Sequence, residues 1–323
     1  MKAVFIEQPC EIDAMRYGDF PTPEPGPGEG LVKVAYSGVN FIDCYHRSGL
    51  YKLPLPAVIG SEGSGKVQKL GEGVTGFKPG DRVAYTIARG SYAEYHSVPA
   101  AQLVKIPDNV DDATAAACML QGCTAQYLTH STFQLKKGHT ALVHAAAGGT
   151  GRLIVQMAAM IGARVIACVG TEAKAKLTLG DGASDAILYD SQDFVAETKR
   201  LTGGKGVEVV YDGVGQATFL KDFDCLKPRG MLVAFGNASG PAAPFDPLLL
   251  SQKGSLYVTR PTLFTYVASR EELEWRTSDL FRWIGEGKLK INIDKVYPLA
   301  EAAQAHRDLE GRKTTGKLLL KVS

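Results

Sequence analysis

Strands and helices alternate regularly through the middle of this chain, and this alternation constrains the fold more than any other feature. Between residues 139 and 259, short apolar segments rich in Val, Ile and Leu are separated by longer segments with helical character. Strands that alternate with helices in this way form a parallel, doubly wound sheet. The strands are expected at 139–144, 164–169, 185–189, 207–212, 231–235 and 255–259, with helices after the first strand, around Lys174, at 194–201 and at 218–226.

A glycine-rich segment follows the first expected strand. Residues 145–151 read Ala-Ala-Ala-Gly-Gly-Thr-Gly, and a helix with Ile154, Met157 and Ile161 on one face begins there. Glycines let the backbone approach a pyrophosphate closely, and the start of a helix offers unpaired N–H groups to an anion. The alternative is a glycine-rich turn that binds nothing, and the strand–helix units around it argue against that. The segment therefore predicts a dinucleotide site.

The end of the second strand indicates which dinucleotide binds. An NAD site usually carries an acidic residue there, to hydrogen-bond with the ribose 2′-hydroxyl. Here Gly170 leaves room, no acid ends the strand, and Lys174 lies one turn into the next helix. A lysine there can neutralise a 2′-phosphate. Glu172 is a counter-argument, and Lys174 could also be a solvated helix charge. NADPH is the predicted cofactor.

The rest of the chain has a different pattern. Residues 1–120 contain short strand-like segments, separated by Pro- and Gly-rich turns, which predict a barrel-like β domain. A helix is expected around 271–285, and the strand-like end at 317–322 is too small to fold alone. It is expected to return to the first domain. The predicted domains are a catalytic domain at 1–121, completed by 265–323, and a nucleotide-binding domain at 122–264.

Composition excludes some functions and favours one compartment. The formal net charge is only +2 and the positive charges are scattered, so a nucleic-acid partner is not expected. No segment is apolar and long enough to predict a membrane span. The six cysteines form no Cys-x-x-Cys pair, which is typical of reduced thiols in a cytoplasmic protein.

Several longer blocks resemble the quinone oxidoreductase (zeta-crystallin-like) branch of the medium-chain dehydrogenases/reductases. The resemblance runs nearly end to end, and its blocks are 40–51, 60–65, 144–151, 210–215, 235–240 and 252–261. It implies an α/β fold with a GroES-like β-rich catalytic domain and an inserted Rossmann domain. It also implies a homodimer joined through Rossmann edge strands.

The same resemblance implies a set of residues that line the cofactor. A basic residue near the end of the chain also reaches the cofactor in relatives, and the tail offers two candidates for it. The implied set is Phe41, Ile42, Asp43, Tyr45, Ala147, Gly148, Gly149, Thr150, Gly170, Thr171, Lys174, Tyr189, Phe235, Gly236, Asn237, Ala238, Pro261 and Leu263, with Arg312 and Lys317 as the basic candidates.

Alcohol dehydrogenases of that superfamily hold a catalytic zinc ion, and the resemblance implies that this chain does not. The positions that match two zinc ligands hold Asn40 and Ser61, and only Cys123 could remain of the third. Catalytic zinc needs three protein donors. Without a Lewis acid, a conjugated acceptor is the expected substrate, because its reduction spreads the negative charge and yields a weakly basic oxyanion.

The expected reaction passes a hydride from NADPH to a quinone or a similar conjugated carbonyl compound. Asn40 is expected to hydrogen-bond with the nicotinamide ribose or the substrate oxygen, and Tyr45 and Tyr51 are candidate proton donors. Each tyrosine could instead be aromatic packing, and Asp43 is expected to brace a loop rather than act as a base. Two other functions stay open: an NADPH-dependent enone or 2-alkenal reductase, and a non-catalytic, crystallin-like nucleotide-binding protein.

Overall fold

The computed structural model describes residues 1–323 and divides into two compact units. Unit 1 contains Met1–Cys123 and Tyr266–Ser323, and unit 2 is the continuous segment Thr124–Thr265 between them. Unit 2 is thus inserted in the chain of unit 1. Helix α2 (Asp112–Tyr127) carries the chain from the first unit into the second.

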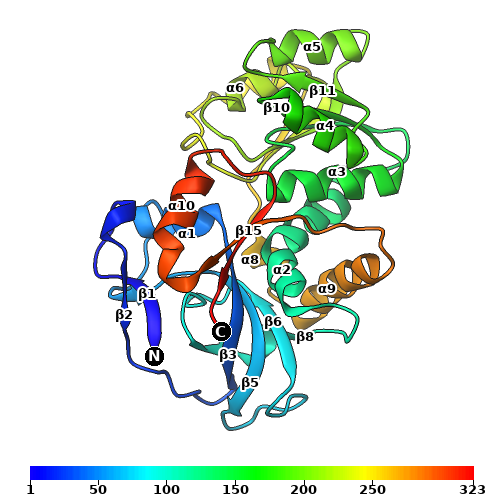
Figure 1. Cartoon of the computed structure of the whole chain (residues 1–323). Helices are drawn as coiled ribbons and strands as arrows, with labels where there is room; N and C mark the ends of the chain where they lie inside the picture. The colour runs from blue at the N-terminus through cyan, green and yellow to red at the C-terminus, as the bar shows by residue number, and fades with distance from the viewer. The chain divides into compact units, whose positions relative to one another are not determined.

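Unit 2 is a six-stranded sheet in which every strand pairs in parallel, as predicted. Its strand order is β11-β10-β9-β12-β13-β14, and it appears in green to yellow in Figure 1. The strands are β9 (Thr140–Val143), β10 (Arg164–Val169), β11 (Asp185–Leu188), β12 (Val207–Asp212), β13 (Leu226–Ala234) and β14 (Tyr257–Thr259). The helices that connect and flank them are α3 (Gly149–Ile161), α4 (Glu172–Gly180), α5 (Phe194–Leu201), α6 (Phe219–Asp222), α7 (Leu248–Gln252) and α8 (Leu263–Tyr266).

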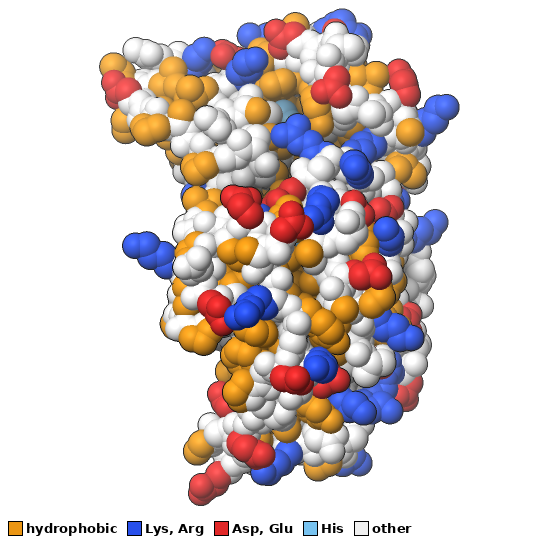
Figure 2. Space-filling model, turned by 60° about the vertical axis from the view of Figure 1, so that its left-hand side comes forward, with side chains coloured by type: hydrophobic (Ala, Val, Ile, Leu, Met, Phe, Trp, Pro, Cys, Tyr) orange, Lys and Arg blue, Asp and Glu red, His pale blue; other side chains and the backbone are white.

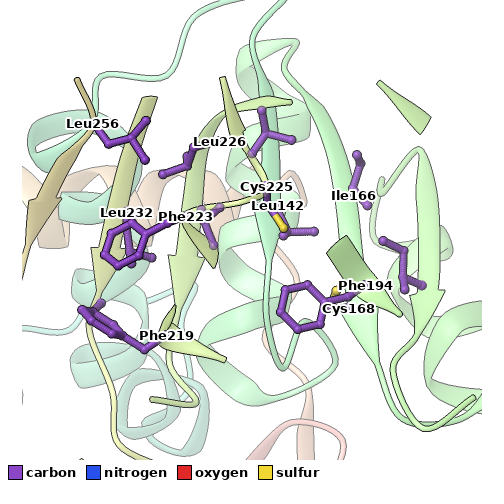
Figure 3. Packing of buried hydrophobic residues seen from close by; sticks show 14 residues of the cluster. Leu142, Ile166, Cys168, Phe194, Phe219, Phe223, Cys225, Leu226, Leu232 and Leu256 are labelled. Carbon is purple, nitrogen blue, oxygen red and sulfur yellow. The ribbon is translucent and has the colours of Figure 1, made fainter. Parts of the chain in front are cut away.

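The core of unit 2 explains why these segments form strands. Side chains such as Leu142, Ile166 and Leu232 come from three strands of the sheet, β9, β10 and β13, and are fully buried. Figure 3 shows them packed with Phe219 and Phe223, which follow β12. Parallel strands with helices on both faces need apolar residues throughout, which is the pattern the sequence shows.

The predicted helix at 218–226 is wrong in length. Helix α6 covers only Phe219–Asp222, and β13 already begins at Leu226. The backbone N–H of Val207 donates to the carbonyl oxygen of Cys225 at 2.9 Å, so the chain is paired in the sheet where the helix was expected. Tertiary pairing therefore overrides the local helical preference of this segment.

Unit 1 contains a seven-stranded, largely antiparallel sheet. Its order is β15-β16-β3-β5-β6-β8, with β7 also paired to β3. The last strand of the chain, in red, lies beside the early strand β3, in blue (Figure 1), with Leu319 opposite Gly38. This pairing confirms that the C-terminal tail returns to the first domain. The strands are β3 (Glu29–Val39), β5 (Glu62–Leu70), β6 (Arg82–Thr86), β7 (Tyr95–Pro99), β8 (Leu103–Lys105), β15 (Ile293–Pro298) and β16 (Lys317–Lys321).

A three-stranded sheet and three helices complete unit 1. The sheet has the order β2-β1-β4 and contains β1 (Lys2–Ile6), β2 (Arg16–Asp19) and β4 (Ala57–Val58). The helices are α1 (Phe41–Ser48), α9 (Arg270–Gly285) and α10 (Ala302–Glu310). Helices α1 and α10 pack on a common apolar cluster that includes Cys44, Ala305 and Leu318, so α1 is held firmly against the sheet.

The surface carries both signs of charge. Figure 2 shows Lys and Arg side chains interspersed with Asp and Glu on the face displayed, with no field of a single sign. Helices here are either too short or too polar to cross a bilayer.

Candidate cofactor and active site

The glycine-rich loop joins β9 to α3 and leaves the start of that helix open. Gly148 is the N-cap residue, and no side chain caps the helix. A Cβ atom on Gly151 would lie 2.4 Å from the carbonyl oxygen of Ala145, so only glycine allows this close passage of the loop over the helix. The N–H groups of the first turn are therefore available to an anion, and the loop fits a dinucleotide pyrophosphate.

A buried histidine directly precedes this loop and is held by two contacts. His144 precedes the loop, and its Nε2 atom lies 2.7 Å from Oδ1 of Asp222. Its ring also packs edge-on against Phe194 at 4.8 Å. Burial lowers the pKa of His144, but the adjacent Asp222 carboxylate outweighs this effect and raises that pKa above its usual value. Sequence reasoning missed Asp222, because nothing local marks an acid 78 residues away as the partner of His144.

The residues predicted to select the cofactor lie together at the ends of β10 and β11. A Cβ atom on Gly170 would be 3.1 Å from the Tyr189 hydroxyl and 3.0 Å from a carboxylate oxygen of Asp190. Gly170, Tyr189 and Thr171 therefore border one small region. Thr171 is the N-cap of α4, and its hydroxyl accepts from the Lys174 N–H at 3.3 Å. Lys174 thus lies in the first turn of that helix, close to Gly170. Asp190 was not predicted, although it directly follows Tyr189.

The segment Phe235–Ala238 crosses the loop that follows β12. The Phe235 ring lies against Gly213, and a Cβ atom on Gly236 would be 2.3 Å from the Gly213 carbonyl oxygen. The Ala238 N–H also donates to that oxygen at 3.2 Å. The next strand, β14, ends two residues before Pro261, and Leu263 is buried. These loops all leave carboxyl ends of parallel strands, which is the edge where such sheets bind ligands.

Helix α1 presents a group of aromatic side chains. Tyr45 and Tyr51 meet edge-on with ring centroids 5.2 Å apart, and Phe41 lies 6.2 Å from Tyr45. Phe41, Ile42 and Tyr45 are each partly exposed. His46 is also near Tyr51, but burial and the charge of Arg89 lower the pKa of His46 to about 4. His46 is therefore neutral near pH 7, and Tyr45 on this helix and Tyr51 in the loop after it remain the candidate proton donors.

Asn40 and Lys317 are both buried and contact each other. Asn40 is 3 % exposed, and its amide nitrogen donates to Glu62 at 2.7 Å. Its amide oxygen accepts from Lys317 at 2.7 Å and from Gln121 at 3.3 Å. The Asn40 side chain is thus occupied by protein partners, and its bond to the substrate or the ribose stays a prediction.

Lys317 likewise has protein partners, and its contact with the cofactor stays a prediction. Its ammonium group contacts Glu62 as well as Asn40, and the residue is 1 % exposed. Of the two basic candidates near the chain end, Arg312 is exposed and Lys317 is buried. Glu62 was not singled out from the sequence, although it stands in the Gly-Ser-Glu block.

Asp43 braces the start of α1, as expected of it. Its carboxylate accepts from the Asn40 N–H at 2.9 Å, from Ser61 at 2.7 Å and from Tyr92 at 3.2 Å. Burial raises the pKa of Asp43 to about 7, while the hydrogen bonds from Ser61 and Asn40 act in the opposite direction. The carboxylate is fully buried and these hydrogen bonds give it a structural role, while its contact with a cofactor stays a prediction.

The donor set does not fit a metal ion. No three His, Cys, Asp or Glu side chains are grouped so that they could hold one. Asn40 and Ser61 are engaged in the hydrogen bonds just described. Burial raises the pKa of Cys123 to about 12, against the opposing effect of Arg276, so this thiol is protonated near pH 7.

Two family models match the chain. The first, described as "Alcohol dehydrogenase GroES-like domain", matches residues 26–108, and the second, described as "Zinc-binding dehydrogenase", matches residues 182–320. The zinc in the second description has no counterpart in the donor set of this chain. The first match places the GroES-like fold in unit 1.

Curated relatives extend over nearly the whole chain. The quinone oxidoreductase of Pseudomonas aeruginosa is 46 % identical over 310 residues, which cover 95 % of each chain. The 2-haloacrylate reductase of a Burkholderia species is 43 % identical over 305 residues, covering 92 % of this chain and 91 % of the relative.

A solved structure shows the same fold. The Escherichia coli quinone oxidoreductase, crystallised with NADPH, superposes with a TM-score of 0.98 at 40 % identity and covers 100 % of both chains. Together with the identities above, this agreement shows that the chain belongs to the quinone oxidoreductase family of the medium-chain dehydrogenases/reductases.

Proposed function

We propose that this protein is an NADPH-dependent quinone oxidoreductase. The observation that carries the proposal is the uncapped start of α3, where the close approach at Gly151 holds the glycine-rich loop against the helix. The chain also matches an NADPH-bound quinone oxidoreductase over its full length. When bound, NADPH supplies the hydride for a two-electron reduction. The protein supplies the binding site, the orientation of the two reactants and a route for one proton.

Residues of unit 2 hold the cofactor in this proposal. The N–H groups of Gly149 and Thr150 bind the pyrophosphate, and Ala147 and Gly148 shape the loop. Lys174 neutralises the 2′-phosphate, while Gly170 and Thr171 leave room for it and Tyr189 flanks it. The remaining contacts come from Phe235, Gly236, Asn237, Ala238, Pro261 and Leu263, and from Arg312 in unit 1.

Residues of helix α1 and the loop after it face the reaction. Phe41, Ile42 and Tyr45 offer an apolar wall against which planar rings stack. The hydroxyl of Tyr45 or Tyr51 provides the proton that the reduced acceptor needs, or positions a water molecule that does so. The single substitutions Tyr45→Phe and Tyr51→Phe separate these two residues, because each keeps the ring and removes only the hydroxyl.

A second function has its own support. The 43 % identity to 2-haloacrylate reductase favours reduction of a carbon–carbon double bond conjugated to a carbonyl group. The chemistry is related, because hydride addition at the β-carbon also produces a delocalised oxyanion.

A substrate panel tests the proposal. We expect NADPH oxidation to be faster with 1,4-benzoquinone and 1,2-naphthoquinone than with 2-alkenals or 2-chloroacrylate. Faster turnover of the alkenals or of 2-chloroacrylate would support the second function. Tight NADPH binding without oxidation by any acceptor would instead indicate a non-catalytic nucleotide-binding protein.

We also propose that the protein is a homodimer joined through the open edge of the unit 2 sheet. Strand β14 ends the sheet and pairs only with β13, so its outer edge is free to pair with a second copy. Tyr257 on this strand is 57 % exposed, which is high for a large apolar side chain. Sedimentation velocity should show a dimer that Tyr257→Lys weakens. Leu220→Lys, at another exposed site of unit 2, should leave the dimer intact.

A cytoplasmic location is part of the same proposal. All six cysteines are free and five of them are buried, which suits a reducing compartment. Fractionation of cells that express the tagged protein from its own chromosomal locus tests this location.

A further inference from the structure

Lys317 is the starting point of a further inference, because a lysine is almost never fully buried without a reason. It is the first residue of β16, and its side chain is 2 % exposed. Its ammonium group donates to Asn40 Oδ1 at 2.7 Å and to Glu62 Oε1. These two partners come from the segment before α1 and from β5, so Lys317 connects three separate parts of unit 1.

Glu62 is fully buried and fully paired. Besides the Lys317 ammonium, its carboxylate accepts from the Asn40 amide at 2.7 Å and from the Leu120 N–H at 2.6 Å. The chain also makes space for it, since a Cβ atom on Gly38 would lie 2.2 Å from Glu62 Oε1. The buried carboxylate therefore depends on Gly38, because a larger residue at that position of the neighbouring strand β3 would overlap it.

The two charges determine how the Asn40 amide is turned. A carboxylate can only accept hydrogen bonds and an ammonium can only donate them. The amide nitrogen must therefore face Glu62 and the amide oxygen must face Lys317, and Gln121 adds a second donor to that oxygen. A neutral partner on either side would permit the flipped amide as well.

The orientation of Asn40 also affects the position of helix α1. It is the N-cap residue of the helix, and its backbone N–H donates to Asp43 in the first turn. The same helix carries Phe41 and Tyr45. A shift of Asn40 would thus move the start of the helix that presents the proposed reacting groups.

Stability alone does not explain this buried ion pair. Removing two charges from water costs several kcal/mol, and apolar pairs of similar size often stabilise a fold equally well. We propose that Lys317 is a positioning residue: together with Glu62 it fixes the Asn40 amide and thereby the position of helix α1 in the reaction. This inference rests on the proposed function, because it concerns the same site.

A set of neutral variants separates positioning from simple stabilisation. Lys317→Met and Glu62→Gln each leave one buried charge unpaired, so both should lower the urea midpoint of unfolding. The double variant Lys317→Met/Glu62→Gln has no unpaired charge and should recover most of that midpoint. If the double variant does not fold, Lys317→Gln/Glu62→Gln keeps polar groups at both positions and allows the same comparison.

The NADPH dissociation constant and kcat of the double variant then test the positioning role. We expect the double variant to keep its NADPH dissociation constant within about threefold, because the Lys317 ammonium group is buried against Asn40 and Glu62. We expect its kcat for 1,4-benzoquinone to fall about 10- to 100-fold, because small misplacements of a reacting group have effects of that size. A double variant with recovered stability and a kcat within about twofold of wild type would overturn the inference.

A matched pair elsewhere in unit 1 serves as the control. Arg82 and Asp112 form a partly buried ion pair at 2.8 Å that does not involve α1. Arg82→Met/Asp112→Asn should change stability and leave kcat unchanged. If wild-type protein reduces no quinone or conjugated carbonyl, the proposed function fails. If wild-type protein is active and the double variant equally so, only the positioning role fails.

Discussion

The hydroxyl of Thr171 accepts a hydrogen bond from the backbone N–H of Lys174 at 3.3 Å. This cap fixes the first turn of α4 next to Gly170 and determines where the Lys174 side chain starts. The exposed Glu172 lies in the same turn, two residues earlier, so the side chains of the acid and the base leave the helix in different directions.

Lys174→Ala should therefore weaken NADPH binding far more than NADH binding. Loss of one charge-assisted hydrogen bond to a phosphate costs about 1.5–3 kcal/mol, which is about a 10- to 150-fold increase in Kd. Fluorescence titration with both cofactors measures the difference. Lys176→Ala, which removes an exposed charge from the same helix, is the control. Equal losses for NADPH and NADH would remove Lys174 from the phosphate site.

Gly151→Ala should damage both the fold and cofactor binding. The new Cβ atom would lie 2.4 Å from the Ala145 carbonyl oxygen and 2.8 Å from the Ala146 Cα atom. Both are backbone atoms that cannot move aside alone, so we expect about 1–3 kcal/mol of destabilisation. NADPH affinity should fall at least about tenfold, because the loop must shift away from the helix start.

Gly180→Ala is the matched control for that substitution. A Cβ atom on Gly180 would meet no atom within 4 Å, and the residue ends α4 with helical geometry. It should change stability by less than about 1 kcal/mol, in the stabilising direction. Thermal unfolding with and without NADPH measures both variants. Equal behaviour of the two would contradict the close packing at Gly151.

The fold could be predicted from the sequence to a large extent, because it depends on local patterns. The alternation of strands and helices after residue 139 indicates the parallel sheet, and the helix expected at 271–285 matches α9 within one residue. The error at α6 arose because β13 extends back to Leu226 through pairing with β12. That pairing is a tertiary contact, and local composition does not encode it.

The site could be predicted only in part, for a related reason. Motifs indicate which residues gather at one edge of a sheet, but not which side chains engage one another. Asn40 and Lys317 were both expected to contact ligands, and they contact each other across 277 residues of sequence. That contact needs both the pairing of β16 with β3 and the burial of Glu62. The sequence around Asn40 indicates neither of them.

His306 should make the fold sensitive to acid. Burial and the nearby Arg47 lower the pKa of this histidine to about 3. Its Nε2 atom faces the Tyr92 hydroxyl, which donates to Asp43 and can accept from the ring. Its Nδ1 atom faces the Arg47 guanidinium and the Cys44 thiol, so a second ring proton on Nδ1 would have no good acceptor. The unfolded chain takes up a proton on this side chain near pH 6.5 and the folded protein does not. The stabilising contribution is therefore complete above pH 6.5 and decreases as the pH falls toward 3.

His306→Gln isolates this effect from other titrating groups. The difference in unfolding free energy between wild type and variant should fall by about 1.4 kcal/mol per pH unit below pH 6.5, since one proton is involved. Urea unfolding at pH 7, 6 and 5 measures it. His139→Gln, in unit 2, controls for the loss of a histidine. A difference that does not change with pH would show that folding does not lower the pKa of His306.

Chelators should leave quinone reduction unchanged. The two positions that match zinc ligands in related alcohol dehydrogenases hold Asn40 and Ser61, and both side chains already have partners within the protein. Cys123 is fully buried with a raised pKa, so binding of a metal there would first require removal of its proton in an apolar setting. Extended dialysis against EDTA or 1,10-phenanthroline should thus change kcat by less than about twofold, and so should Cys123→Ala. Loss of activity on dialysis, followed by recovery with added zinc, would show that a donor set outside these residues holds a metal ion required for the reaction.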